Sequence, residues 1–142
     1  MKVIIAGSRS IKDPQIVLMA ISESGFDITE VVSGGAVGVD RIGEAYARRN
    51  KIPIKHFLPD WSLGKGAGFI RNGEMAKYAD ALIAVWDRQS HGTLNMIKQS
   101  YNLGKSVFVL TLGLDGDGRK VIIYSEIKPL TNPPKPDTLP TH

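Results

Sequence analysis

The sequence predicts an α/β protein with a doubly wound, mostly parallel sheet of five or more strands and helices on both faces. Short apolar runs alternate along the chain with segments of helical periodicity, which is the pattern of β-α-β units. Residues 81–86, "ALIAVW", are apolar at nearly every position, as is typical of a strand buried on both faces of a parallel sheet. Glycine-containing turns follow four of the apolar runs. A chain of 142 residues suits one domain with a single core, which we place at residues 1–128.

The first half of the chain contains three predicted strands and two predicted helices. Asp13 followed by Pro14 is a helix N-cap with a first-turn proline, and Gly25 ends that helix. Behind the turn "SGGAVG", apolar residues recur at helical spacing from Val39 onward. The predicted elements are a strand at 2–6, a helix at 14–25, a strand at 29–33, a helix at 39–50 and a strand at 52–57.

The second half continues the alternation and then departs from it. A glycine-rich loop leads into a helix, and Gly104 is the predicted C-cap of the next helix. After Thr111 the turn cluster "GLDGDG" precedes one more apolar run, which we expect at an antiparallel edge. The predicted elements are a helix at 69–78, strands at 81–86 and 106–110 with a helix ending at 103 between them, and a strand at 120–124. Residues 129–142 are proline-rich and polar, which predicts an extended or disordered tail.

Composition excludes several classes of site. The chain has no cysteine, so disulfides, thiolate metal sites and cysteine nucleophiles are excluded, and its three histidines show no metal-ligand spacing. No apolar run approaches the length of a membrane span, and the amino-terminal run is too short for a secretory signal, so we expect a cytoplasmic protein. The net charge of +4 favours anionic ligands, but the basic residues are too dispersed for a nucleic-acid-binding face.

Four turns are predicted to meet at the carboxyl edge of the sheet, where ligands of such folds bind. One glycine-rich turn is explained by relief of steric crowding, but four at the same edge favour a ligand site. Neither G-x-G-x-x-G nor a P-loop is present, which disfavours ordinary dinucleotide and Walker-type sites. The candidate ligand-binding residues are Gly7, Ser8, Arg9, Ser33, Gly34, Gly35, Gly38, Asp40, Arg71, Asn72, Ser90, Gly92 and Thr93.

These turns suit phosphate or another anion. Backbone N–H groups at the glycine turns and at helix N-termini hold phosphate oxygens, and Arg9 and Arg71 are able to clamp them bidentately. The alternative for Arg71 is a surface ion pair with Glu74 or Asp60, which contributes little.

Other side chains near the turns have two interpretations each. Asp40 either caps its helix or accepts hydrogen bonds from a ribose hydroxyl or a base. Trp61 and Phe69 are candidate stacking surfaces, whereas Trp86 at the end of a buried strand is expected in the core. His91 has no carboxylate near it in sequence to orient it, so we predict no catalytic residue, no metal site and no cofactor.

The segments "AGSRS", "VVSGGAVGVDRIGEAYA", "GAGFIRNGEMAKYADALIAVW" and "SHGTLNMIKQSYNLGKSVFVL" together resemble the SLOG superfamily, over residues 2–110. This Rossmann-like group includes the DNA-processing Smf proteins and the Lonely-guy cytokinin-activating hydrolases. The chain is most similar to the small single-domain YspA-like branch, a family of unknown function. The resemblance implies a nucleotide or nucleotide-derived ligand, such as an ADP-ribose derivative or a cyclic nucleotide, that is sensed or sequestered. It also implies a homodimer or higher homo-oligomer, formed through helices that flank the site.

One position departs from the Lonely-guy pattern. Those hydrolases carry "PGGxGTxxE", whose glutamate takes part in cleaving the N-glycosidic bond, and the similar stretch here places Met96 at the glutamate's position. A thioether cannot act as an acid, a base or a charge stabiliser, which favours a binding protein over an enzyme. Two alternatives stay open. One is hydrolysis of nucleoside monophosphates with Asp40, Asp87 or Glu74 as the carboxylate, and the other is Smf-like binding of single-stranded DNA.

Overall fold

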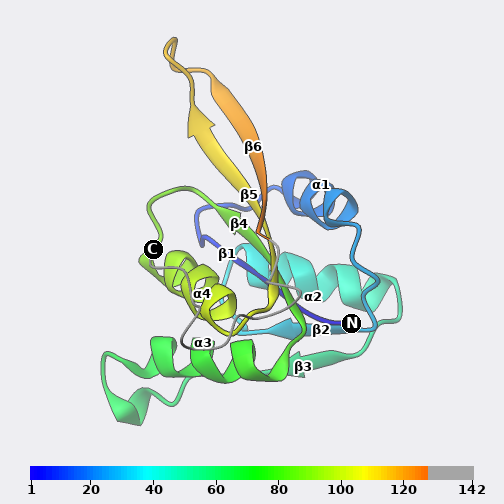
Figure 1. Ribbon diagram of the computed structural model, residues 1–142, viewed down its shortest axis with the longest axis vertical. Coiled ribbons are helices and arrows are strands. Elements are labelled where there is room, and N and C mark those ends of the chain that lie inside the picture. The colour runs from blue at the N-terminus through cyan, green and yellow to red at the C-terminus, as the bar shows by residue number, and fades with distance from the viewer. Residues whose placement is uncertain (128–142) are drawn as a thin grey trace, which may run out of the picture.

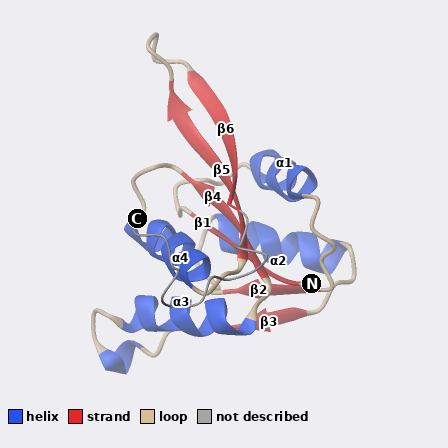
Figure 2. Ribbon diagram, viewed as in Figure 1, coloured by secondary structure: helices blue, strands red, loops and turns tan. Residues whose placement is uncertain are grey.

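A computed structural model describes residues 1–127 of the chain and shows one six-stranded sheet between two layers of helices (Figures 1 and 2). The strands lie in the order β3-β2-β1-β4-β5-β6, and all are parallel except β6, which runs antiparallel to β5. The strands are β1 (Lys2–Gly7), β2 (Glu30–Ser33), β3 (Ile54–His56), β4 (Ala81–Trp86), β5 (Ser106–Leu114) and β6 (Lys120–Ile127). The helices are α1 (Pro14–Ser24), α2 (Val39–Arg49), α3 (Ala67–Tyr78) and α4 (His91–Asn102), with a 3-10 turn η1 (Trp61–Leu63). The predicted fold class is confirmed, including its antiparallel edge.

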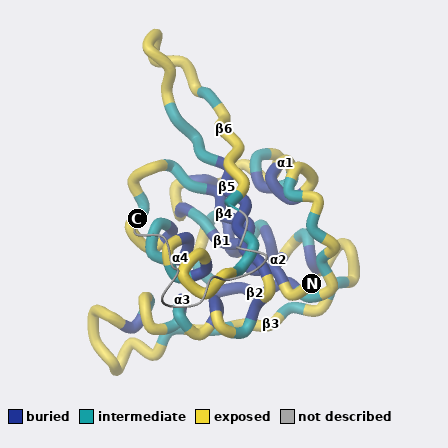
Figure 3. The backbone as a smooth tube through the Cα atoms, viewed as in Figure 1, coloured by how far each residue is buried: buried dark blue, intermediate teal, exposed yellow. Residues whose placement is uncertain are grey.

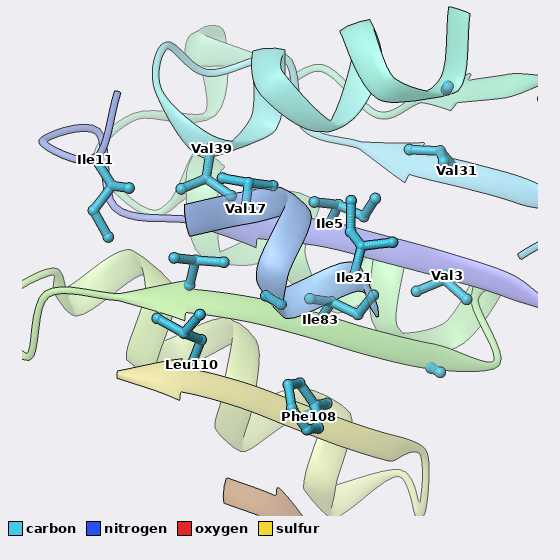
Figure 4. Packing of buried hydrophobic residues seen from close by; sticks show 14 residues of the cluster. Val3, Ile5, Ile11, Val17, Ile21, Val31, Val39, Ile83, Phe108 and Leu110 are labelled. Atoms are coloured by element: carbon cyan, nitrogen blue, oxygen red, sulfur yellow. The ribbon is translucent and has the colours of Figure 1, made fainter. Parts of the chain in front are cut away.

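The sheet separates two apolar clusters. On one face, Val17 and Ile21 of α1 and Val39 of α2 pack on Ile5 and Ile83 of the central strands (Figure 4). On the other face, α3 and α4 bring their own apolar side chains to the sheet. That second cluster is built from Ile4, Ala6, Val32, Met75, Ala76, Leu82, Ala84, Met96, Ile97, Val107 and Val109, with Ala79 beside them.

Strand β4 lies at the centre of the sheet, and this position explains why its sequence is apolar throughout. Successive side chains of a strand point to opposite faces. Ile83 and Val85 therefore enter the α1–α2 cluster, while Leu82 and Ala84 enter the α3–α4 cluster. Because helices cover both faces, neither set reaches solvent, and all four side chains are buried.

The order of the strands reverses between β1 and β4. From β1 the chain moves outward through β2 and β3, then returns to pair β4 with the other side of β1 and continues to β5. The turns that leave β1 and β4 therefore diverge toward opposite faces of the sheet and leave a crevice between them at the carboxyl edge. This reversal positions the site described below.

Several element boundaries differ from the predicted ones. Helix α3 begins at Ala67, before the predicted residue 69, and β3 is shorter than the predicted 52–57. Strand β5 continues to Leu114 because its last residues pair with β6 alone, past the end of β4 (Figure 1). The predicted tail at 129–142 lies outside the described residues. None of the helices in residues 1–127 has the length and apolar content to cross a membrane.

Candidate functional site

A cavity of about 450 Å³ opens at the carboxyl edge, where the strand order reverses. Its wall is formed by the ends of β1 and β4, the first turn of α2, η1, and parts of α3 and α4. The predicted site residues that the structure brings to this wall are Gly7, Arg9, Asp40, Trp61, Phe69, Arg71, Asn72, Ser90, Gly92 and Thr93.

Arg71 is held over the glycine turn that follows β2. Its Nη1 donates to the carbonyl oxygen of Gly34 at 2.8 Å and more weakly to that of Phe57 at 3.4 Å, while its Nε donates to Oδ1 of Asn72 at 3.1 Å. A Cβ atom on Gly34 would lie 2.5 Å from Nη1, so only glycine lets the guanidinium approach this closely. Among the described residues, neither Glu74 nor Asp60 forms an ion pair with Arg71. The guanidinium is therefore fixed at the cavity rather than on the outer surface.

Asp40 lies in the first turn of α2 with only 5% of its surface exposed. It does not cap α2; its Oδ2 accepts from the N–H of Ala36 in the preceding turn, at 3.3 Å. Burial raises the pKa of Asp40 from 3.8 to about 6, against the opposing effects of the Ala36 hydrogen bond and the positive charge of Arg71. A carboxyl group with this pKa exchanges its proton near neutral pH.

The cavity wall contains two arginines, Arg9 and Arg71, and two aspartates, Asp40 and Asp87. Burial lowers the pKa of Arg71, the carboxylate of Asp40 opposes that shift, and the nearby charge of Arg9 adds to it. The second carboxylate in the wall is Asp87, which accepts from the hydroxyl of Ser10 at 2.7 Å and from the N–H groups of Gln89 and Ser90 at 2.8 and 2.9 Å. Burial alone raises the pKa of Asp87, but these hydrogen bonds lower it to about 2. Its oxygens are thus committed to the turn after β4.

The amino end of α4 forms another part of the wall. Ser90 caps this helix, because its Oγ accepts from the N–H of Thr93 at 3.2 Å and from the Thr93 hydroxyl at 2.9 Å. Asn72 of α3 donates from Nδ2 to the carbonyl oxygen of Gly92 at 3.2 Å, which ties α3 to this turn. Since the first N–H groups of a helix have no partner within it, the Gly92 N–H remains suited to an anion, whereas the Thr93 N–H is occupied.

Apolar side chains complete the cavity. Met75 and Met96 lie at its base and are each 1% exposed, whereas Trp61 and Phe69 lie in the wall with 65% and 49% of their surfaces exposed. The η1 segment that carries Trp61 is exposed along its length (Figure 3). Trp86 packs against the α3–α4 cluster instead, and its Nε1 donates to the Ser90 carbonyl oxygen at 3.0 Å.

Five predicted site residues lie behind the wall: Ser8, Ser33, Gly34, Gly35 and Gly38. The Ser8 Oγ accepts from the N–H of Asp87 at 3.0 Å and so joins the turns after β1 and β4. Gly38 has a positive φ of 83°, and a Cβ there would lie 2.8 Å from the carbonyl oxygen of Ser8. These residues support the turns that form the cavity.

The sequence did not point to a polar cluster behind the same turn, in which Ser33 and Glu44 are buried and Arg48 and His56 are exposed. Ser33 donates from Oγ to Oε2 of Glu44 at 2.6 Å, and Oε1 of Glu44 lies 3.2 Å from both Arg48 Nη2 and His56 Nε2. Burial alone raises the pKa of Glu44, but the hydrogen bonds of Ser33 and His56, with the charges of His56 and Arg48, lower it overall. The cluster holds the end of β2 against α2 and β3. Across residues 1–127, no group of three or more His, Asp or Glu side chains is arranged to hold a metal ion.

A family model described as "YspA, cpYpsA-related SLOG family" matches residues 1–64. Over this segment the chain is similar to the SLOG family. No curated protein matches the sequence. The matched segment contains β1, the glycine turn after β2, and α2, and thus contributes Arg9 and Asp40 to the cavity, whereas Arg71 and α4 lie beyond it. This similarity suggests a nucleotide-related function.

Proposed function

We propose that the protein binds a phosphorylated nucleotide, or a nucleotide-derived signalling molecule, in the cavity at the carboxyl edge of the sheet. The observation that carries this proposal is the placement of Arg9 and Arg71 in one cavity wall, where neither forms a salt bridge with a residue of 1–127. A volume of about 450 Å³ falls in the range of small-molecule sites. As a sensor or sequestering protein, the chain would need to hold such a molecule without converting it.

The proposed pose follows from the chemistry of the wall. The phosphate lies between Arg9 and Arg71, where guanidinium groups offer paired donors and the Gly92 N–H adds the amino end of α4. The base lies toward Trp61 and Phe69, whose rings are accessible for stacking. Phosphate offers the two arginines an anionic partner that accepts paired hydrogen bonds, and the aromatic rings favour a planar base over a simple sugar phosphate.

A thermal-shift screen tests this proposal. The panel contains nucleoside monophosphates, cyclic mononucleotides, cyclic dinucleotides and ADP-ribose, with adenosine and ribose 5-phosphate as controls that each lack one half of the proposed ligand. A ligand present at 100 times its Kd is expected to add about 2.7 kcal/mol to the free energy of unfolding. Failure of every phosphorylated member to raise the Tm above that of its controls would contradict the proposal.

Hydrolysis of an N-glycosidic bond is the second candidate, and Asp40 is the observation that favours it. A buried carboxyl group whose pKa is about 6, in a cavity beside Arg71, is suited to general acid or base chemistry. Against it, Met96 lies in the wall at the position where Lonely-guy hydrolases carry a glutamate. Glu74 is exposed and lies outside the wall, and the oxygens of Asp87 accept from Ser10, Gln89 and Ser90, which leaves Asp40 as the carboxylate best placed to act.

Incubation with AMP and other monophosphates, followed by chromatography for free base, separates the two candidates. We expect no release of base above that of a protein-free control. Turnover that disappears in the Asp40→Asn variant would replace the binding function with the hydrolase.

A further inference from the structure

Strand β6 leaves a long, apolar edge uncovered within residues 1–127. It is the last strand of the sheet, and the hairpin that it forms with β5 extends beyond the helices (Figures 1 and 3). Ile122, Ile123 and Tyr124 are 39%, 49% and 40% exposed. Proteins protect such edges with inward charges, proline or bulges, yet residues 121–125, "VIIYS", contain neither a charge nor a proline. The edge is therefore suited to pairing with another strand.

The hydrogen-bonding groups of this edge follow from the register of the hairpin. Asp115 donates its N–H to the carbonyl oxygen of Arg119 at 2.8 Å, and the ladder then pairs Leu114 with Lys120. In an antiparallel ladder, pairs that exchange hydrogen bonds alternate with pairs that do not. The odd-numbered residues of β6 thus face β5 with their N–H and C=O groups. The even-numbered residues direct these groups to the outer edge: Lys120, Ile122, Tyr124 and Glu126.

A second copy of β6 complements this edge in one register better than in any other. In an antiparallel pair related by a two-fold axis at Ile123, every even-numbered residue lies opposite an even-numbered residue, so all the outward N–H and C=O groups find partners. In that register Lys120 lies opposite the second copy's Glu126, and Ile122 lies opposite the second copy's Tyr124. The charge pair occurs twice because of the symmetry. Registers centred on Ile122 or Tyr124 lose both charge pairs, and each pairs only three of the four outward-facing residues of β6.

We infer that the protein forms a two-fold symmetric dimer in which the β6 strands of two copies pair antiparallel about Ile123 and join their sheets. The evidence is the uncovered apolar edge, the match of its outward groups and the complementary charges at its two ends. This surface is formed by the β5–β6 hairpin, shares no residue with the nucleotide cavity, and does not depend on the proposed function. The inferred dimer also differs from one formed through the helices that flank the cavity.

Charge reversal tests the inference on the full chain, by sedimentation velocity over a range of protein concentrations. In the Lys120→Glu dimer, a glutamate lies opposite a glutamate in both of the symmetry-related pairs. In the Glu126→Lys dimer, a lysine lies opposite a lysine in both pairs. Because opposite charges across a ladder stabilise it and like charges destabilise it, each variant is expected to weaken dimerisation roughly tenfold or more. An equimolar mixture of the two variants restores both pairs and should dimerise as the wild type does, as should the double variant.

A proline substitution tests the ladder itself. Ile122→Pro removes an outward N–H while leaving the hydrogen bonds to β5, and should abolish the dimer without unfolding the hairpin. Ile122→Thr, which retains the N–H, is the matched control and should dimerise. A monomeric wild type would overturn the inference, and so would reversal variants that dimerise as well as the wild type or a mixture that stays monomeric.

Discussion

The two edges of the sheet arrange their charged groups differently. At the amino edge several polar groups have partners: the amino terminus donates to the carbonyl oxygen of Asp27 at 2.7 Å, and the N–H of Lys2 donates to Oδ2 of Asp80 at 2.8 Å. The Lys2 Nζ lies 4.3 Å from the centre of the Tyr78 ring, and the Tyr78 hydroxyl donates to Glu30. At the carboxyl edge, by contrast, Arg9 and Arg71 share a cavity with the buried Asp40, whose pKa is raised, and none of the three forms a salt bridge within residues 1–127.

This difference separates groups that stabilise the fold from groups that, in the proposed function, bind a ligand. Both edges belong to the same strands and the same two apolar clusters, so packing alone does not distinguish them. Hydrogen bonds between committed partners contribute to stability, whereas a buried carboxyl group with a raised pKa detracts from it when ionised. Substitutions confined to one edge of the sheet test this distinction.

The largest effect is expected from Asp40→Asn. Since burial raises the folded-state pKa of Asp40 from 3.8 to about 6, the folded chain retains a proton that the unfolded chain has released. The stability contributed by the protonated form is fully present below about pH 4 and is lost as the pH rises through about 6. The asparagine variant cannot ionise and escapes this loss. Relative to wild type, its free energy of unfolding should therefore increase by roughly 3 kcal/mol between about pH 4 and pH 7.

Urea unfolding of both proteins across this pH range measures that difference. The comparison between variants removes the contributions of other titrating groups, such as Asp87 and Glu44. A difference that does not change with pH would show that Asp40 ionises in the folded protein as it does in water.

Arg71→Ala should leave the fold intact and weaken binding of the phosphorylated ligand roughly 10- to 150-fold, or about 1.5–3 kcal/mol. The reason is the loss of a charged, bidentate donor that Gly34 and Asn72 hold in place. Arg71→Lys should recover only part of the affinity, because an ammonium group cannot reproduce the planar fork. Calorimetric titration of the three proteins with the ligand found in the screen provides the measurement. Unchanged affinity in the alanine variant would remove Arg71 from the site.

A smaller loss is expected from Trp61→Ala. Stacking of a base on an aromatic side chain contributes about 1–3 kcal/mol, and the exposed position of Trp61 favours the lower end, roughly fivefold in affinity. Leu63→Ala is the matched control, because Leu63 is an exposed apolar residue of the same turn but lies outside the cavity wall. Equal effects of the two substitutions would mean that Trp61 does not contact the base.

The smallest effect on binding is expected at the amino edge. Tyr78→Phe removes the hydroxyl that bonds Glu30 but keeps the ring beneath the Lys2 ammonium group. We expect a slight decrease in Tm and no change in ligand affinity, measured by the same titration. A change in affinity would indicate that the two edges are coupled through β1 and β4.

Local patterns were sufficient to predict most of the fold. The apolar run of β4 and the Asp13–Pro14 start of α1 carry their own signals, and the structure places both where the sequence predicted. The boundaries of β5 and α3 differ from the predicted ones because they depend on distant residues or on glycine. Leu112 and Leu114 become strand residues only by pairing with β6, and the glycines at the start of α3 have no strong helical preference of their own.

The location of the candidate site was predictable from the sequence, whereas the contacts between its side chains were not. Convergence of the turns follows from the parallel topology, which the alternation of strands and helices predicts. The contact of Arg71 with Gly34 joins residues from different β-α units, and nothing near Arg71 in sequence indicates it. The cluster of Ser33, Glu44 and His56 is likewise formed by three separate elements. Its serine was predicted as a ligand contact because its neighbours are glycines, although its hydroxyl is committed to Glu44.

The pairing of β1 with β4 has a consequence for how the chain folds during synthesis. β1 is an inner strand, yet one of its two neighbours is about eighty residues away in sequence, and Val3 and Ile5 pack in the same cluster as Ile83 and Val85. While residues 1–64 emerge from the ribosome, β1 can pair with β2 but retains an open edge, and its apolar faces lack part of the cluster that buries them. Contacts between such distant residues form late because a long loop must close first. Residues 1–64, the segment that matches the family model, are therefore not a folding unit. The nascent chain needs β4 before β1 is enclosed on both sides.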